Sequence, residues 1–400
     1  MTILIAPILL SVACLGLITS TVFCALVVIS AIRFGRRRKA AVVRLSQFYP
    51  AISVLKPLHG ESPGLERNIE SFFGQDYAGP YELLFCARHE SDEGLQLARR
   101  IAAKYPEVNA RFVACGEPSF PNPKVYSLRS LAAGAKHDLF ITSDADVRVK
   151  PNYLSHCIQE LLAPEIDLAF CLYRGIMDTR NNFFSALDAV GKSVEMSSGV
   201  LVADMLSGTD FALGPTMILR RRSFVEAGGF ADLGRYYADD FVLGNRLAGR
   251  GRGVAIAAHV IDLVIPAESA RDSFRNQLRW MQSTRRSRPW GHLGTVLTFA
   301  MPFGLLGFIA EASQGNLLAA LFFFAAATLN RIIQSAVVLT ALGAEEIVVP
   351  CLMYPLRDLL GSVLWVCSYL FSGTHYHGAQ FRIMPDGTID CDPELHRESS

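Results

Sequence analysis

The feature that most restricts this chain is a long run without a charged residue, from Ile3 to Ile32. About 20 apolar residues in a helix span the hydrocarbon core of a bilayer, and this run exceeds that length. It ends in Arg33 and the basic cluster Arg36 to Lys39. Because basic residues stay on the cytoplasmic side of a membrane, the cluster predicts an external N-terminus and a cytoplasmic domain after it.

We interpret residues 1–40 as a transmembrane signal anchor with a basic flank rather than a cleaved signal peptide. No charged segment precedes the apolar run, and the run is longer than the apolar region of a signal peptide. Hydrophobic residues make up 51% of the chain, and its mean hydropathy of +0.28 is high for a soluble protein. The net charge of +1 gives no indication of a nucleic-acid partner. The nine cysteines are scattered and predict reduced thiols.

Residues from about 50 to 290 show predicted strands that alternate with predicted helices. Apolar runs indicate strands at 51–55, 81–86, 110–114 and 139–141. Apolar side chains at helical spacing indicate helices at 64–73, 95–105 and 123–135. This alternation predicts an α/β fold with a largely parallel sheet. After Pro151 the pattern is less regular, with a strand at 166–171 and one or two helices at 184–205.

Two carboxylates follow the predicted strand at 139–141, at Asp144 and Asp146. In open α/β sheets, ligands bind at the carboxyl ends of the strands. Carboxylate oxygens suit Mg²⁺ or Mn²⁺, and such a cation can hold a diphosphate. The same pair is also compatible with a polar turn that has no ligand.

Two further segments carry charges with more than one interpretation. Asp239 and Asp240 begin a predicted helix that runs to about Leu247, where acids are also favoured by the helix dipole alone. The segment from Ser273 to Arg288 is rich in arginine and contains Trp280. It has the composition of a helix on a membrane surface, and its arginines are equally suited to bind a diphosphate.

The C-terminal part of the chain, residues 291–372, again resembles membrane sequence. Apolar runs predict spans at 293–309, 317–342 and 347–371, and Pro302 predicts a kink in the first. The pairs Asn330-Arg331 and Arg357-Asp358 interrupt the second and the third span. Charges at that depth are costly unless they face protein or pair with one another. Residues 373–400 form a tail with a short predicted strand at 379–383.

The order of these features resembles the ceramide glucosyltransferases, and the resemblance extends from Ile52 to about Ile383. The motifs that carry it are Leu55-Lys56-Pro57-Leu58, Asp92, Asn122-Pro123-Lys124, Asp144-Ala145-Asp146-Val147-Arg148-Val149, Ala238-Asp239-Asp240-Phe241 and Gln277-Leu278-Arg279-Trp280. The resemblance implies a GT-A fold at 50–290, on the cytoplasmic side, with transmembrane helices before and after it. It also implies an inverting hexosyltransferase that takes a sugar from a UDP-sugar.

The resemblance implies a role for each motif residue. Asp240 is expected to be the general base and Asp146 the ligand of a divalent cation, Mn²⁺ or Mg²⁺. The expected substrate-binding residues are Asp92, Lys124, Asp144, Asp239, Gln277, Arg279 and Trp280. Glu90 is an alternative to Asp92 in the same acidic loop. The expected partners are a UDP-sugar, a membrane lipid acceptor and the bilayer, and the expected location is a multi-pass membrane protein.

Several functions share these motifs or this membrane pattern. The favoured reaction transfers glucose to ceramide. A hopanoid-lipid N-acetylglucosaminyltransferase would use the same mechanism and the same motif set. A processive polysaccharide synthase usually has more spans to form a channel. A membrane transporter or scaffold has no need of four acids at the ends of strands and helices.

Overall fold

The computed structural model describes residues 2–43, 48–178, 182–371, 373–376 and 379–390. The chain divides into two compact units, and each contains segments that are distant in sequence. A helical unit comprises residues 1–36, 180–206 and 268–372, and an α/β unit comprises residues 37–179, 207–267 and 373–400. The first half of the α/β unit follows the predicted alternation closely.

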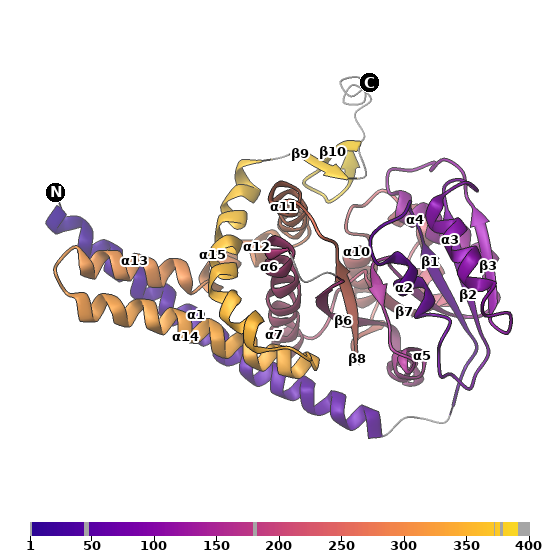
Figure 1. The fold of residues 1–400 in the computed structure, drawn as a ribbon, viewed down its shortest axis with the longest axis horizontal. Helices are drawn as coiled ribbons and strands as arrows, with labels where there is room; N and C mark the ends of the chain where they lie inside the picture. Colours follow the sequence, from indigo (N-terminus) through magenta and orange to yellow (C-terminus); the bar gives the residue numbers. More distant parts are fainter. Residues whose placement is uncertain (1, 44–47, 179–181, 372, 377–378, 391–400) are drawn as a thin grey trace. The chain divides into compact units, whose positions relative to one another are not determined.

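An eight-stranded mixed sheet forms the centre of the α/β unit, in the order β3-β2-β1-β4-β7-β6-β8-β5. The first four strands in this order are parallel and lie side by side (Figure 1). They are β1 (Ile52–Pro57), β2 (Tyr81–Ala87), β3 (Asn109–Ala114) and β4 (Leu139–Ser143). These are the four strands that the apolar runs predicted, and β1, β2 and β4 are almost wholly buried.

The second half of the sheet mixes directions. β7 (Thr216–Arg220) is antiparallel to both β4 and β6 (Ile166–Met177), whereas β6 and β8 (Gly253–Ile265) are parallel. The short β5 (Val147–Arg148) closes the edge beside β8. The predicted α/β class is therefore confirmed, and the parallel character holds for β1 to β4 and for the pair β6 and β8.

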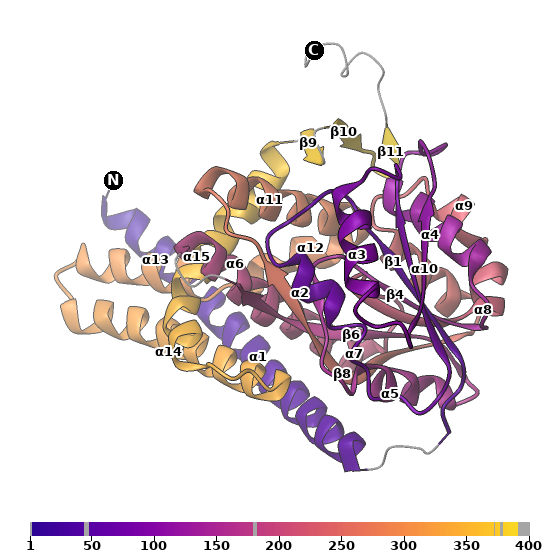
Figure 2. The ribbon, with the colours of Figure 1, turned by 45° about the vertical axis from the view of Figure 1, so that its right-hand side comes forward.

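Helices connect the strands of the α/β unit. α2 (Leu65–Glu70), α3 (Glu93–Ala102) and α4 (Pro123–Gly134) follow the first three strands, and α5 (Tyr153–Cys157) follows β5. The short helices α8 (Arg221–Glu226) and α9 (Gly229–Leu233) follow β7, and α9 packs on α4 (Figure 2). α10 (Asp239–Gly249) begins at the predicted acidic pair. The predicted strand at 379–383 is present as β10 (Ala379–Ile383), between β9 (Gly373–Tyr376) and β11 (Ile389–Asp390).

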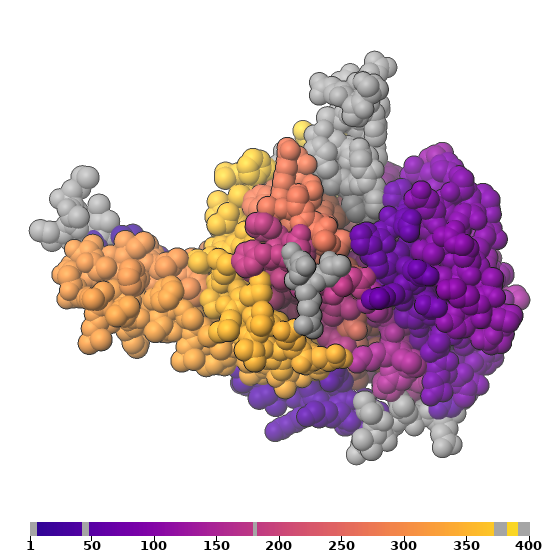
Figure 3. Space-filling view, in the orientation of Figure 1, coloured from indigo at the N-terminus to yellow at the C-terminus, as the bar shows by residue number. Residues whose placement is uncertain are grey.

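The helical unit is built from long apolar helices and a broken helix. Most of α1 (Thr2–Val43) belongs to it, together with α6 (Phe183–Gly191) and α7 (Ser197–Ser207), which are joined by the π-helical turn Lys192–Met196. Its C-terminal half contains α11 (Ala270–Ser287), α12 (Pro289–Gly294), a 3₁₀ turn Thr295–Thr298, α13 (Met301–Ala312), α14 (Leu317–Leu342) and α15 (Val348–Leu370). α13 and α14 pack along one another as the orange block of Figure 3.

Two described helices are long and apolar enough to cross a membrane, over Ala6–Ala41 and Leu317–Leu342. A third span results if Pro289–Thr298 and Met301–Ala312 are one span with a bend of 44°. The bend lies just before Pro302, where the sequence predicted a kink. α15 occupies the predicted third C-terminal span and is not among these candidates. Exposed apolar side chains on α14, such as Leu318 and Phe322, suit contact with lipid.

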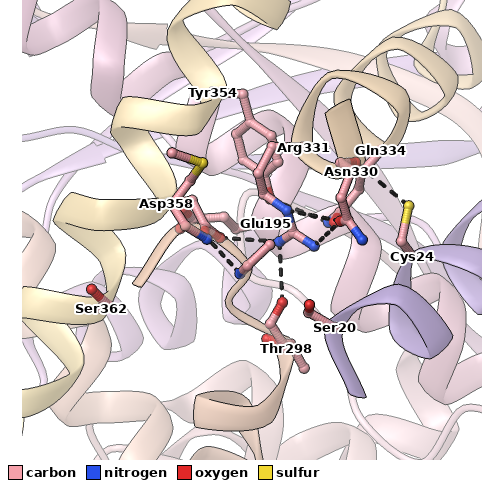
Figure 4. Close-up of polar contacts among 12 residues, drawn as sticks. Ser20, Cys24, Glu195, Thr298, Asn330, Arg331, Gln334, Tyr354, Asp358 and Ser362 are labelled. Carbon is pink, nitrogen blue, oxygen red and sulfur yellow. Dashed lines mark hydrogen bonds and ion pairs between the residues drawn. The ribbon is translucent and has the colours of Figure 1, made fainter. Parts of the chain in front are cut away.

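The charged pairs do not interrupt their helices, because each charge has a partner within the helical unit. α14 is continuous through Asn330-Arg331, and α15 through Arg357-Asp358. Arg331 pairs with Asp358 at 3.0 Å, and Arg357 pairs with Glu195 at 2.7 Å. Figure 4 shows contacts from Asp358, Thr298 and Asn330 converging on Arg331, with Glu195 and Tyr354 beside them. The condition that such charges must pair is therefore met.

The predicted domain limits differ from the compact units. Residues 180–206 and 268–290 were assigned to the domain at 50–290, but they cluster with the apolar helices. α6 and α11 both pack on α15, which explains the difference. The tail 373–400 clusters with the α/β unit, although residues 391–400 lie outside the part of the chain that is described.

Candidate active site

The turn that contains Asp144 and Asp146 leaves the end of β4 in the middle of the sheet. Ser143 pairs with Thr216 on β7, and the N–H of Asp144 then donates to the carbonyl of Pro215 at 3.1 Å. The N–H of Val147 donates back to the carbonyl of Asp144, which closes the turn. The carbonyl of Asp146 accepts from Val264 on β8. Both carboxylates are thus attached to a backbone that the sheet fixes on two sides.

Lys56, on β1, holds this turn by a hydrogen bond to its backbone. Its Nζ donates to the carbonyl of Asp144 at 2.6 Å, and it lies 4.0 Å from the centroid of the Phe72 ring. Lys56 is 1% exposed. Burial lowers the pKa of Lys56 to about 7, although the carboxylates of Asp146 and Asp144 oppose the shift. Lys56 therefore donates a hydrogen bond to the turn and has a side chain that can gain or lose its charge near neutral pH.

Asn68 holds the same turn from α2. Its amide donates to the carbonyl of Ala145 at 3.2 Å and accepts from Arg148 Nε at 3.0 Å. Arg148 also pairs with Asp178 at 2.6 Å. Asn68 is buried, so its polar groups require such partners. The turn is therefore held by a connected set of hydrogen bonds before any substrate is present.

Lys124 is a basic residue that lies among the acidic residues of the candidate site. Asn122 caps α4 by accepting from the N–H of Val125, and Pro123 occupies the first turn. This places the Nζ of Lys124 2.6 Å from Asp144 Oδ1. Burial alone would lower the pKa of Lys124, but Asp144, Asp239 and Asp240 together raise it. Lys124 is therefore positively charged at neutral pH.

Asp239 and Asp240 begin α10 and belong to the same cluster. Asp240 Oδ2 accepts from the N–H of Gly214 at 2.5 Å, and its Oδ1 accepts from the N–H of Phe241 at 2.8 Å. Asp239 is 7% exposed, and its Oδ1 accepts from the amide of Asn122 at 3.4 Å. Within the motif Asn122-Pro123-Lys124, Asn122 thus contacts Asp239 directly, and Lys124 provides a positive charge near both acids.

The environment of the acidic pair raises the pKa of both carboxyls. Burial raises the pKa of Asp239 to about 7, with Lys124 opposing this and the charges of Asp240 and Asp144 adding to it. Burial likewise raises the pKa of Asp240, with Lys124 and the N–H donors of Phe241 and Gly214 opposing it. Because a general base works best with a pKa near the operating pH, the pair is suited to proton transfer at neutral pH.

Asp92 lies at the N-terminus of α3, where both of its carboxylate oxygens accept backbone hydrogen bonds. Oδ1 accepts from Leu95 at 3.1 Å as the helix cap, and Oδ2 accepts from Gly60 at 2.9 Å. The alternative acid Glu90 is exposed and pairs with Arg99 at 2.5 Å. Asp92 thus joins the loop after β1 to the helix after β2, and its contact with a substrate stays a prediction.

The carboxylates suit a divalent cation that is shared with a substrate. Within the described ranges, no group of three or more His, Cys, Asp or Glu side chains is placed to hold a metal ion. Mg²⁺ is commonly bound by one or two carboxylates together with substrate phosphates and water. Asp146 is exposed, and Asp144 is 28% exposed beside Lys124. The residues present therefore fit a cation that arrives with a diphosphate.

Gln277, Arg279 and Trp280 lie on α11 of the helical unit, whereas the other predicted site residues belong to the α/β unit. Gln277 is buried, and Arg279 and Trp280 are half-buried. Lys192 Nζ lies 5.4 Å from the centroid of the Trp280 ring. Lys124, Asp144, Asp239 and Asp240 thus form one cluster within the α/β unit. The α11 motif belongs to the helical unit.

Three residues that shape the acidic cluster were not among the predicted site residues. Lys56 and Asn68 support the turn, and the backbone of Gly214 binds Asp240. Lys56 lies in a motif that carried the resemblance, so a lysine directly after a buried apolar run was an available signal. Gly214 gave no signal, because its contribution is a backbone N–H and the absence of a side chain. A Cβ there would lie 2.9 Å from Asp240 Oδ2.

Ceramide glucosyltransferases are among the curated proteins that this chain is similar to. Ceramide glucosyltransferase 1 of Caenorhabditis elegans is 29% identical over 218 residues, which cover 52% of this chain and 44% of the relative. Ceramide glucosyltransferase 3 of the same organism is 27% identical over 289 residues, which cover 71% of this chain and 62% of the relative. The chain spans about half the length of these curated relatives.

The similarity to solved structures is lower. A mannosyltransferase from Pyrobaculum calidifontis, in complex with GDP-Man and Mn²⁺, is 16% identical with a TM-score of 0.47, over 89% of this chain and 99% of that one. The model of the family described as glycosyl transferase family 21 matches residues 10–389. Because this match covers nearly the whole chain, the chain belongs to glycosyl transferase family 21.

Proposed function

We propose that this protein is an inverting hexosyltransferase that transfers glucose from UDP-glucose to the primary hydroxyl of ceramide. Family membership supports the sugar transfer, and the curated relatives support the lipid acceptor. The observation that carries the proposal is the cluster of Lys124, Asp144 and Asp240 beside the carboxyl end of β4. It combines a base with a raised pKa and a cation suited to phosphate.

Asp240 acts as the general base. The lipid hydroxyl oxygen attacks the anomeric carbon of the sugar, the bond from that carbon to the diphosphate oxygen breaks, and UDP departs with the electron pair. The hydroxyl proton passes to the carboxylate of Asp240. The N–H groups of Gly214 and Phe241 hold this carboxylate in one orientation. Fixed orientation matters because a base must lie within hydrogen-bond reach of the proton that it removes.

Lys124 and the turn acids act on the nucleotide side. Asp144 orients the nucleotide-sugar, and Asp146 is the expected ligand of Mn²⁺ or Mg²⁺. A bound cation of this kind stabilises negative charge on the leaving diphosphate. Lys124, which pairs with Asp144 at 2.6 Å, can exchange this partner for a phosphate oxygen when the nucleotide binds. In open α/β sheets, ligands bind at the carboxyl ends of the strands, which is where these acids lie on β4.

The location of the protein follows from its apolar helices. Two candidate spans among the described helices support a membrane protein. We infer that the α/β unit faces the cytoplasm, because the basic cluster Arg36 to Lys39 follows the first span. We treat the protein as multi-pass because more than one described helix is a candidate span. A lipid acceptor is then already present in the same membrane.

The experiment is a donor and acceptor matrix with purified full-length protein. UDP-glucose, UDP-galactose and UDP-N-acetylglucosamine are each paired with ceramide and with a hydroxylated hopanoid, with and without Mn²⁺ or Mg²⁺. We expect glucosylceramide, with the anomeric configuration inverted. Product on the hopanoid alone would retain the mechanism and replace the acceptor. A retained configuration would exclude the proposed direct displacement.

A further inference from the structure

The π-helical turn Lys192–Met196 reaches the α11 motif directly at Trp280 and, through Arg357, at Gln277. Lys192 extends toward the ring of Trp280, with its Nζ 5.4 Å from the centroid. Glu195 pairs with Arg357 Nη2 at 2.7 Å, and Arg357 Nη1 donates to Gln277 Oε1. One turn of irregular helix therefore reaches both ends of the motif. π-Helical segments are rare, appear mostly as single turns inside α-helices, and are frequent at functional sites.

The amide of Gln277 is used within the protein on both sides. Its oxygen accepts from Arg357, and its Nε2 donates to Ser273 Oγ at 2.8 Å. Gln277 is 7% exposed and Arg357 is 5% exposed. A buried charge that is hydrogen-bonded on several sides has little freedom to move. These contacts attach α11 to α15 and to the π-turn.

Gly191, directly before the π-turn, makes room for Arg357. A Cβ at this position would lie 2.2 Å from Arg357 Nε. Any larger residue therefore displaces the guanidinium group from its present place. Gly199, one helix further on, has nothing within 4 Å of its Cβ position. The chain thus offers a substitution that moves Arg357 and a matched one that does not.

We propose that Glu195 and Arg357 are positioning residues that fix Gln277 and thereby the orientation of Arg279 and Trp280 toward the substrate. In this arrangement Gln277 serves the motif as an anchor of α11. The π-turn sets the geometry, because Lys192 and Glu195 reach the two ends of the motif from it. The inference rests on the proposed function, since that function gives the motif a substrate to contact.

The decisive comparison is Gly191→Ala against Gly199→Ala in purified full-length protein. We expect Gly191→Ala to lower kcat for lipid glycosylation roughly ten- to hundredfold, because a displacement of about 1 Å at a catalytic contact has an effect of this size. The KM for the UDP-sugar should change less than about twofold, since the donor cluster belongs to the other unit. Gly199→Ala should retain the wild-type kcat. Equal kcat values for the two variants would overturn the proposal.

Two further comparisons separate positioning from simple destabilisation. Gly191→Ala in a Gln277→Leu background should lower kcat no further, because both changes remove the same contact; additive losses would contradict the proposal. Glu195→Asp keeps the charge and should recover more of the activity than Glu195→Gln, and equal losses would count against positioning.

A readout without catalysis keeps this test separate from the proposed function. The fluorescence of Trp280 is isolated by subtracting the emission of a Trp280→Phe variant in each background. We expect Gly191→Ala to shift that difference spectrum and Gly199→Ala to leave it unchanged. A wild-type protein that glycosylates no lipid would end the proposed function, while an unshifted Trp280 spectrum would end the positioning role.

Discussion

At the scale of single residues, the site depends on a glycine that leaves space for two charges. A Cβ at Gly214 would lie 2.9 Å from Asp240 Oδ2 and 3.2 Å from Lys124 Nζ. We expect Gly214→Ala to move the Asp240 carboxylate and to lower kcat by roughly tenfold or more. Steady-state glycosylation assays measure this change.

Gly249, near the end of α10, provides the matched control because nothing lies within 4 Å of its Cβ position. Gly249→Ala should keep the wild-type rate and melting temperature. Similar rates for the two alanine variants would mean that the position of Asp240 is unimportant.

The acidic pair also predicts how activity depends on pH. The pKa of Asp239 is about 7 and that of Asp240 is raised, with burial as the largest cause in both. A base that holds a proton is inactive, so kcat should fall as the pH drops through the raised pKa of Asp240. Lys124 lowers the pKa of both carboxyls, and Lys124→Met should therefore move this acidic limb to higher pH. Profiles of kcat against pH measure this shift. An acidic limb that stays in place or moves to lower pH in Lys124→Met would contradict the assignment of Asp240 as the base.

The sequence identified the acids and Lys124 but not their supports, for physical reasons. Asp144, Asp146, Asp239 and Asp240 are charged residues at predicted element ends, so a local pattern indicates them. The contact between Lys124 and Asp144 joins α4 to the end of β4, and only the folded chain shows it. The contribution of Gly214 is a backbone group, which no pattern of side chains indicates.

At the scale of elements, the cap of α3 offers a test of Asp92. Asp92→Ala removes the acceptor for the N–H groups of Leu95 and Gly60, and such a loss costs about 0.5–2 kcal/mol of stability. Asp92→Asn keeps one of the two acceptors, so it should lose less stability than Asp92→Ala in thermal unfolding. If Asp92 also binds the nucleotide, Asp92→Asn raises the KM for the UDP-sugar. An unchanged KM would restrict Asp92 to the cap.

The strands and helices of residues 50–150 follow from apolar periodicity, because each of β1, β2 and β4 is buried over nearly its whole length. The strand order and directions in the mixed half of the sheet could not be predicted from the sequence pattern. β7 enters antiparallel to β4, and its place is set by pairing with distant residues. The grouping of α6 and α11 with the apolar helices likewise depends on contacts with α15, which periodicity does not report.

At the scale of the whole molecule, buried charge pairs stabilise the helical unit. Asp358 pairs with Arg331, and its Oδ2 accepts from the N–H groups of Ala300 and Met301 at the start of α13. Asp358→Asn leaves Arg331 buried without a counter-charge, which costs about 3–5 kcal/mol in comparable cases. We expect a marked loss of folded protein in detergent, measured by size-exclusion chromatography and thermal unfolding.

Glu346 is exposed between α14 and α15 and provides the control for a lost carboxylate. Glu346→Gln should behave as wild type. A stable Asp358→Asn protein with an unchanged melting temperature would show that the pair contributes little to the helical unit.

The most direct test of the central claim is the rate of sugar transfer to ceramide by wild type, Asp240→Asn and Asp232→Asn. Asp232 is a half-exposed acid that pairs with Arg246, so its loss controls for removal of a carboxylate from the same unit. We predict that Asp240→Asn loses at least roughly a hundredfold in kcat while UDP binding, measured by calorimetry, persists. Asp232→Asn should keep the wild-type rate. Full activity of Asp240→Asn would contradict the account, because the proton of the acceptor would then go elsewhere.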